Sequence, residues 1–499
     1  MSTRRSFVKT LSLAGSSVFL PARSYMRAQG SNEKIRVAGI GVGGRGPGIF
    51  KDALDTNQVR IVALCDVDAQ RAEGGKANFE KNPLNGQANI KVYTDIRKLL
   101  ESKEIDAVMI ATPNHWHTLA AIWAMQAGLD VYVEKPVSHT LWEGRQLAAA
   151  AAKYKKMVQS GTQSRSSGGL KAAHQWLEKL PLGKLRYARG TCYKRRASIG
   201  KVSDAQAVPS NIDYDLWCGP AQNLPVRRQK LHYDWHWLWE YGNGDFGNQG
   251  VHQVDVARWF LNEGHLPPQV LSIGGRLGYD DDGETPNTQI VSFNYEKAPL
   301  YFEVRGLPKA ADSKEMDNYR KSQVGVVLQY ERGHVLIPSY SSATAFNEKG
   351  DPVHHFGSAK ADQQADSVPR IEGGKETHAM NFFNAMRSRD ASRLSCPSHE
   401  GHLSSALCHL ASISHRLGEK GSEQQLKSAI KNDADMGDSL GRMLEHLQAN
   451  SVNLNVTPLT LGQRLRVDPK TEQCIENAPA NALLHRKDRK GFEIPKLTA

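Results

Sequence analysis

Closely spaced glycines at the end of an apolar run are the first chemically informative feature of this chain. Gly41-x-Gly43-x-x-Gly46 directly follows the apolar residues 35–40, and a second apolar run, residues 61–65, ends in Asp66. Glycines let a backbone approach a pyrophosphate, and an acid at the end of the second strand can accept hydrogen bonds from ribose hydroxyls. The order of strand, glycine turn, helix and acid therefore predicts a site for NAD.

The acids after the second run bear on which dinucleotide is bound. Asp66 and Asp68 would repel the 2′-phosphate of NADP, so the sequence favours NAD. Arg71 is close enough to attract such a phosphate, which keeps NADP as an alternative. A tight turn that binds no nucleotide is the structural alternative for the glycines.

Two further segments contain groups that could move a proton. Lys135, in Glu134-Lys-Pro136, follows an apolar run, where burial and a cationic ring would lower the pKa of its amine; a salt bridge with Glu134 is the structural alternative. His252 and Asp255 are three residues apart at the start of a predicted helix, so Asp255 could orient His252. Oxidation of an alcohol needs a base beside the hydride acceptor, and Lys135 and His252 are the candidates.

Aromatic residues between positions 231 and 241 could bind a sugar. In an extended segment these would line one side: Trp235, Trp237, Trp239 and Tyr241. Such a row suits the apolar face of a sugar ring or, equally, a packed core. Asp234 and His236 would then point elsewhere, as ligands of hydroxyls or as structural groups, and Arg165 is a further candidate for the pocket.

Metal binding has little support in the sequence. His115 and His117 have no third ligand at a suitable spacing, and the six cysteines include no Cys-x-x-Cys pair. We therefore predict no metal site, and we expect most of the cysteines to be buried free thiols.

The elements that must position these residues fall into two regions. Between residues 35 and 161, short apolar runs alternate with helix-like segments, which is typical of a doubly wound parallel sheet, the Rossmann fold. Ligands of that fold lie beyond the carboxyl ends of the strands, where residues 111–117 and 134–136 are expected. From residue 164 to 418, β-rich runs and long loops predict an α/β domain with an open, mainly antiparallel sheet.

The two ends of the chain are set apart from these domains. Arg4-Arg5-x-Phe7, followed by a modestly apolar stretch, resembles a twin-arginine export signal; a disordered basic tail is the alternative. We expect the twin-arginine machinery to export the folded protein to a bacterial periplasm. The predicted boundaries are 1–30 for the signal, 31–163 for the Rossmann domain, 164–418 for the substrate domain and 419–499 for a charged extension of unassigned role.

Composition restricts the classes of partner. The chain has 499 residues and a net charge of +12, but its basic residues are dispersed and no groove-reading motif accompanies them. A solvated basic surface is therefore expected, and no binding of nucleic acid. No stretch after the leader is apolar enough to span a bilayer, so no membrane span is predicted.

Four motifs together resemble one known family, that of glucose-fructose oxidoreductase, inositol dehydrogenase and MocA-like proteins. In chain order they are Gly41-x-Gly43-x-x-Gly46, Ala111-Thr-Pro-Asn114, Glu134-Lys-Pro136 and Gly250-x-His252-x-x-Asp255. The resemblance covers residues 34–418. It implies sugar or polyol substrates at the junction of the two domains and a dimer or tetramer formed through the exposed face of the second sheet.

The same resemblance assigns expected roles to individual residues. It implies catalysis by Lys135 together with His252. It also implies that these residues lie against the cofactor: Thr112, Pro113, Asn114, Glu134 and Lys135. We expect the substrate to be bound by Asn248, Asp255, Arg165, Trp235 and His236.

One position departs from the family pattern. An aspartate usually precedes the histidine by four residues, whereas this chain has Asn248, which can hold a sugar hydroxyl but cannot accept its proton. Proton transfer would then rest on Lys135 and His252, which weakens the expectation of a simple dehydrogenase.

Three classes of function follow. The first is an NAD-dependent oxidoreductase acting on a secondary hydroxyl of a sugar, polyol or glycoside, with a tightly held cofactor because a periplasm has no ready supply of NAD. The second is a redox-neutral lyase or glycoside hydrolase that works through a transient keto-sugar, which Asn248 makes more attractive. The third is a cofactor-stabilised binding protein without catalysis.

Overall fold

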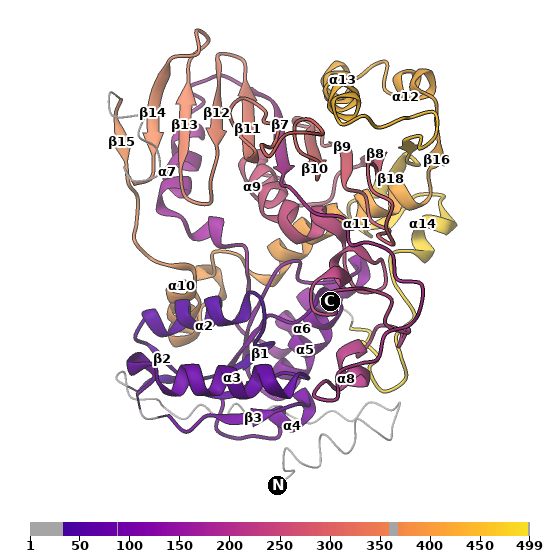
Figure 1. Ribbon diagram of the computed structural model, residues 1–499. Helices are drawn as coiled ribbons and strands as arrows, with labels where there is room; N and C mark the ends of the chain where they lie inside the picture. The colour runs from indigo at the N-terminus through magenta and orange to yellow at the C-terminus, as the bar shows by residue number, and fades with distance from the viewer. Residues whose placement is uncertain (1–32, 87, 359–367, 498–499) are drawn as a thin grey trace.

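The computed structural model describes residues 33–86, 88–358 and 368–497. The predicted export signal, residues 1–30, lies outside these residues. Within them, no helix combines the length and apolar character that a membrane span requires. Figure 1 shows the described chain as two α/β units, with the N-terminal unit below a larger sheet.

The first unit is built on a parallel sheet whose described strands follow the order β3-β2-β1-β4-β5-β6. The strands are β1 (Ile35–Ile40), β2 (Val59–Cys65), β3 (Lys91–Tyr93), β4 (Ala107–Ile110), β5 (Asp130–Val133) and β6 (Val158–Ser160). The helices between them are α2 (Gly46–Asp55), α3 (Ala69–Glu80), α4 (Ile96–Leu100), α5 (Asn114–Gln126) and α6 (Leu141–Tyr154). The central strands β4 and β5 are buried throughout, because helices cover both faces of the sheet. The predicted Rossmann fold is confirmed.

The chain reverses its direction of winding next to β1, which pairs with β2 on one side and with β4 on the other. A crevice opens at such a switch point beyond the carboxyl ends of the strands. The turns after β1, β2, β4 and β5 all reach this edge. Their residues are therefore brought together by the topology and not by proximity in the chain.

The second unit contains a larger sheet, with strand order β15-β14-β13-β12-β11-β7-β10-β9-β8-β17-β16 among the described residues. Its strands are β7 (Leu185–Tyr193), β8 (Gln269–Gly275), β9 (Thr288–Asn294), β10 (Leu300–Arg305), β11 (Val324–Tyr330), β12 (Gly333–Ile337), β13 (Ala343–Phe346), β14 (Pro352–Phe356), β15 (Arg370–Ile371), β16 (Glu419–Lys420) and β17 (Thr460–Leu461). Two more, β18 (Leu465–Asp468) and β19 (Gln473–Cys474), pair beside β8. Among the described strand pairs of this sheet, only β7–β10 and β14–β15 are parallel, so the predicted mainly antiparallel sheet is confirmed.

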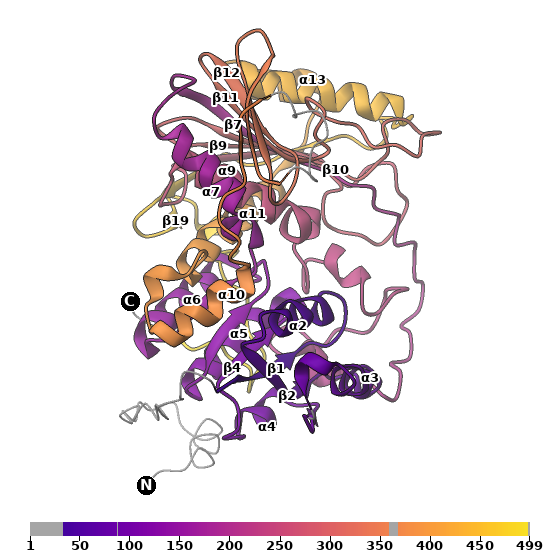
Figure 2. The ribbon, with the colours of Figure 1, turned by 90° about the vertical axis from the view of Figure 1, so that its left-hand side faces the viewer.

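Alternate residues of this sheet pack against helices on opposite faces. Val270 of β8 lies in the core formed with α9 (Val251–Leu261) and α11 (Ser398–Arg416), whereas Leu271 and Ile273 pack against α13 (Ala434–Ala449). Figure 2 shows α13 on the opposite side of the sheet from α9 and α11. The period of two along a strand explains the division.

One helix from the segment predicted to form the second domain, residues 164–418, lies against the first unit. α10 (His378–Ser388) packs its phenylalanines and Met386 into the core formed by β1 and α2. Figure 1 shows α10 beside α2. The two units are thus held together by apolar packing as well as by the chain connection.

The C-terminal segment, treated above as an extension, is integrated into both units. Strands β16, β17 and β18 continue the large sheet. Beyond α14 (Ala478–Ala482), the chain returns to the Rossmann unit, where Phe492 and Ile494 pack against Trp116. The sequence of the segment is rich in charged residues because its helices are amphipathic and only their apolar face packs against the protein.

A buried ion cluster also fixes α13 to the sheet. Glu303 of β10 accepts hydrogen bonds from Arg442 of α13 at 2.5 Å and from Arg189 of β7 at 3.1 Å. Burial alone would raise the pKa of Glu303, but the two guanidinium groups lower it to about 2. α13 therefore covers part of the sheet face through which we expected subunits to associate, and the oligomeric state stays a prediction.

We predict that α13 is part of the cooperative fold. Leu440 is 1% exposed within the apolar layer between α13 and the sheet, so Leu440→Ala should lower the free energy of unfolding by about 2–4 kcal/mol. Urea unfolding followed by circular dichroism measures this change. The exposed Glu445→Ala on the same helix is the control and should change it by no more than about 0.5 kcal/mol. Equal unfolding midpoints for the two variants would contradict the prediction.

Candidate active site

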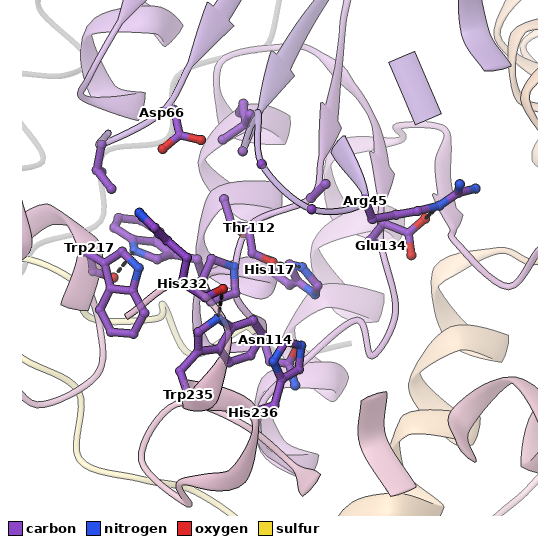
Figure 3. Close-up of a pocket in the computed structure, with 18 of the residues that line it drawn as sticks. Arg45, Asp66, Thr112, Asn114, His117, Glu134, Trp217, His232, Trp235 and His236 are labelled. Atoms are coloured by element: carbon purple, nitrogen blue, oxygen red, sulfur yellow. Dashed lines mark hydrogen bonds and ion pairs between the residues drawn. The ribbon is translucent and has the colours of Figure 1, made fainter. Parts of the chain in front are cut away.

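The turns at the carboxyl edge of the Rossmann sheet form one side of an elongated pocket, and a second-domain segment forms the other. Figure 3 shows Asp66 at one end, Trp235 and His236 farther along, and Thr112 and Asn114 between them. Residues of both domains thus face the same space. The pocket is lined by several Rossmann turns on one side and by residues of the second domain on the other.

At Gly41 and Gly46 the shape of the glycine turn admits only glycine. Gly41 has φ +84°, and a Cβ built there would lie 2.6 Å from the carbonyl oxygen of Ala111. A Cβ on Gly46 would lie 2.1 Å from the carbonyl oxygen of Gly41, and one on Gly43 would meet the guanidinium of Arg71. Open backbone next to the start of α2 is what a pyrophosphate requires. These residues fit a dinucleotide.

Asp66 is held in place at the end of β2. Its Oδ2 accepts a hydrogen bond from Val42 N at 2.7 Å and its Oδ1 accepts one from Asp68 N at 3.0 Å. Burial raises the pKa of Asp66, and these two hydrogen bonds oppose the rise. Asp68 is turned away from the pocket: it caps α3 and bonds His232 at 3.0 Å. Of the two acids, only Asp66 lines the pocket.

The turn after β4 has an unpaired polar atom. Thr112 lines the pocket, and its buried Oγ1 has no hydrogen-bond partner within the described residues, as expected of a group that bonds a ligand. Asn114 begins α5 and donates to Asn243 Oδ1 at 2.9 Å. His117 bridges the carbonyls of Thr112 and Pro136 at 2.8 and 2.6 Å. This histidine therefore joins the two loops.

Glu134 and Lys135 follow β5 and line the pocket. Lys135 Nζ donates to the carbonyl of Asn248 at 2.7 Å, across the junction of the domains. Burial lowers the pKa of Lys135, the charge of Glu134 raises it, and the cations Arg45, Lys194 and Arg196 lower it further. The amine is thus biased toward its neutral form, which can accept a proton.

His252 lies behind this lysine and is not one of the residues that line the pocket. Its buried Nδ1 has no partner in the described part of the chain, and the edge of its ring meets Tyr340 at 5.0 Å between centroids. Burial lowers the pKa of His252 well below its usual value, and the charge of Lys135 adds to the effect. Its catalytic role stays a prediction.

Arg165 and Asp255 require a correction. They form a buried ion pair, with Arg165 Nη2 at 2.9 Å from Asp255 Oδ1, and Ser404 donates to the same oxygen at 2.6 Å. Neither lines the pocket, and among the described contacts Asp255 makes no hydrogen bond to His252. A carboxylate that is already saturated cannot bind substrate. The pair fixes the start of the second domain to α9, and our assignment of it to the substrate was wrong.

The segment from residue 231 to 241 is also different from the prediction. Residues Asp234–Trp237 form a 3₁₀ turn, so alternate side chains do not share a face. Trp235 and its neighbour His236 both line the pocket, with their rings stacked 3.7 Å apart, whereas Tyr241 belongs to a separate apolar cluster. The predicted aromatic row is wrong, although Trp235 and His236 do reach the pocket.

The pocket residues missed from the sequence include Lys194, Arg196, Tyr233 and Gln249. Lys194 and Arg196 follow β7 directly, and a basic triplet at the end of a predicted strand was a usable signal. Arg196 is held by Asp245 at 2.7 Å, which removes Asp245 as a free base. Within the described residues, no three His, Cys, Asp or Glu side chains form a metal site, and all six cysteines are buried and free.

Comparison with known families agrees with this architecture. The model described as "Oxidoreductase family, NAD-binding Rossmann fold" matches residues 35–162. The model described as "Oxidoreductase family, C-terminal alpha/beta domain" matches residues 182–297. Both belong to the Gfo/Idh/MocA group, and their order along the chain is that of the two domains.

Individual relatives cover different parts of the chain. A protein named glycosyl hydrolase family 109 protein 1, from Bacteroides fragilis, is 39% identical over 110 residues, which are 22% of this chain and 24% of the relative. The chain thus matches about a quarter of that relative. An inositol 2-dehydrogenase/D-chiro-inositol 3-dehydrogenase from Lacticaseibacillus casei is 24% identical over 285 residues, 54% of this chain and 74% of the relative.

The fold also occurs among solved structures. The WlbA dehydrogenase from Bordetella pertussis, solved with NADH and UDP-GlcNAcA, matches with a TM-score of 0.53 and 18% identity over 76% of this chain and 95% of that one. At this identity the likeness concerns the fold alone. With both domain models matched in order and the glycine turn and lysine in one pocket, the chain belongs to the Gfo/Idh/MocA oxidoreductase family.

Proposed function

We propose that this protein binds NAD and oxidises a secondary hydroxyl of a sugar, polyol or glycoside. The observation that carries the proposal is that the glycine cradle and the amine of Lys135 open into one pocket, which residues of the second domain close. When bound, the nicotinamide would supply the hydride acceptor. A dinucleotide site with a base beside it and a polar, aromatic wall opposite suits alcohol oxidation.

The lysine would act on the hydroxyl proton. Its Nζ is fixed by the carbonyl of Asn248, and its lowered pKa makes the neutral amine available. The side chain of Asn248, which also lines the pocket, would hold a hydroxyl by hydrogen bonds. Proton acceptance is thus assigned to Lys135 and hydroxyl orientation to Asn248.

His236 offers a second anchor for the sugar. Its Nδ1 lies 2.5 Å from the carbonyl of Tyr233, which can only accept, so Nδ1 carries the hydrogen and Nε2 is an acceptor. Burial lowers the pKa of His236 to about 3, which keeps the ring neutral. Stacked on Trp235, the ring is well fixed to accept a hydrogen bond from a substrate hydroxyl.

A second candidate is redox-neutral cleavage of a glycoside through a transient keto-sugar. Two observations favour it: several relatives are named glycosyl hydrolase family 109 proteins, and Asn248 stands where the family usually has an aspartate. Both candidates share oxidation of a hydroxyl. They differ in whether reduced cofactor accumulates.

We also propose that the protein works in the periplasm with a tightly held cofactor. The support is the twin-arginine pattern at residues 4–7. A dinucleotide bound before export and regenerated in each cycle would need no free supply. We propose a carbohydrate as the small-molecule partner of the protein.

The test is a panel of sugars and glycosides mixed with protein that was purified without added nucleotide. Nicotinamide absorbance and product mass are followed together. Reduction that becomes catalytic on addition of NAD supports the oxidoreductase. Bond cleavage without net reduction supports the second candidate, and no nucleotide binding together with no turnover would contradict both.

Lys135 should dominate the pH dependence of turnover. Because burial lowers its pKa, the neutral amine should form, and kcat should rise with pH, in a range below that of an exposed lysine. Lys135→Arg keeps the charge but cannot lose its proton, so kcat should fall about 10²- to 10⁴-fold while the Kd for NAD changes little. Stopped-flow absorbance from pH 6 to 10 measures this. A variant with the parent's pH profile and kcat would contradict the assignment.

Asp66 should set the preference for NAD. Asp66→Asn keeps an acceptor for Val42 N but removes the charge that repels a 2′-phosphate, so the ratio of the Kd values for NADP and NAD should fall about tenfold. Tryptophan fluorescence titration measures both constants. Glu73→Gln, an exposed change on α3, removes the same charge outside the pocket and should leave the ratio as it is. Equal ratios in all three proteins would refute the role of Asp66.

A further inference from the structure

Positive side chains gather in the pocket where the two domains meet. Lys194 and Arg196, which follow β7, line the wall opposite the Rossmann turns, and Lys135 and Arg45 face them. Of the three pocket acids, Glu134 lies next to Lys135, whereas Asp66 and Asp95 follow β2 and β3 in the part that would hold the adenosine. We call Lys194 and Arg196 the basic wall.

Two of these four cations already have an anionic partner. Arg45 lies 3.2 Å from Asp52 and 3.7 Å from Glu134. Arg196 is bound by Asp245 at 2.7 Å, and its Nη1 donates to the hydroxyl of Tyr233 at 3.0 Å.

Lys194, like Lys135, has an uncharged described partner. Its exposed Nζ donates to Gln249 Oε1 at 3.0 Å, and no carboxylate of the described residues pairs with it. Gln249 is in turn fixed by the hydroxyl of Tyr340 at 2.7 Å. The ammonium group is therefore positioned in the pocket and still able to bind an anion.

The basic wall is adjacent to the reacting centre. Gln249 directly follows Asn248, whose carbonyl accepts from Lys135 Nζ, so a continuous row of contacts runs from Lys135 to Lys194. The charge of Lys194 lowers the pKa of both Lys135 and His252. An anion at Lys194 would compensate this excess of positive charge, whereas a neutral sugar would leave it.

We propose that the substrate is a saccharide with an anionic substituent, a carboxylate or a sulfate ester, and that Lys194 binds this group. The proposal rests on the function proposed above and adds the substrate class. Arg196 strengthens the local positive potential. Because Arg196 is paired with Asp245, Lys194 is the residue that would contact the anionic group directly. The pyrophosphate of a dinucleotide does not account for Lys194, because the cradle for it is the glycine turn on the opposite wall.

Binding to the NAD-loaded full-length protein tests the proposal. Calorimetry compares methyl glucoside with methyl glucuronoside and methyl glucoside 6-sulfate, and repeats the series with the galacto-configured sugars. In at least one series we expect an anionic sugar to bind at least tenfold more tightly than its neutral counterpart. Whether the carboxylate or the sulfate binds better identifies the source of the anion.

Two charge-matched variants localise the effect. Lys194→Gln should remove about tenfold of the affinity for the anionic sugar and change that for the neutral sugar less than twofold. Arg195→Gln removes the same charge from the neighbouring exposed residue, which does not line the pocket, and should keep the preference. Far-ultraviolet circular dichroism checks that both variants are folded.

Three outcomes would overturn the proposal: equal affinity for neutral and anionic sugars, no binding of any anionic sugar, or equal losses in Lys194→Gln and Arg195→Gln. The proposed function is judged separately. Reduction of NAD by a neutral sugar without any preference for an anion would keep that function and reject this inference. Binding that depends on Lys194 without any turnover on the panel would keep this inference and reject the proposed function.

Discussion

The hydrogen bond from Lys135 Nζ to the carbonyl of Asn248 is the contact on which the site depends. It joins the end of β5 in the Rossmann domain to the turn that leads into α9, so the group that would move a proton is fixed by the wall that would hold the sugar. The contact restricts the motion of the amine, and burial lowers its pKa, which favours the neutral form. Position and reactivity thus have one cause.

Contacts elsewhere in the fold keep the end of β5 and the turn before α9 in fixed relative positions. The packing of α10 on the Rossmann core and the returning C-terminal segment connect the domains, and the Arg165–Asp255 pair fixes the start of the second domain to α9. Buried ion pairs of this kind contribute little net stability but are costly to break, so this pair keeps the start of the second domain fixed on α9. The pocket is therefore shaped by contacts that mostly lie outside it.

The sequence predicts the parts of this architecture that are local. The glycines, Asp66 and Lys135 occur at the ends of apolar runs, and parallel topology brings strand ends together, so their meeting could be foreseen. Other features depend on contacts between distant residues. No local pattern shows that Asp255 pairs with Arg165, or that residues 434–449 cover the sheet. The prediction of an extended aromatic row failed for another reason. Alternating aromatic residues suit a strand, but the backbone hydrogen bonds of Asp234–Trp237 form a 3₁₀ turn.

The most direct test of the account is a crystal structure of the full-length protein with NADH. The account predicts the pyrophosphate on the turn from Gly41 to Gly46, the adenosine ribose at Asp66, and the nicotinamide beside Lys135 and facing the wall formed by Trp235 and His236. A dinucleotide bound elsewhere, or a nicotinamide turned away from Lys135, would contradict it.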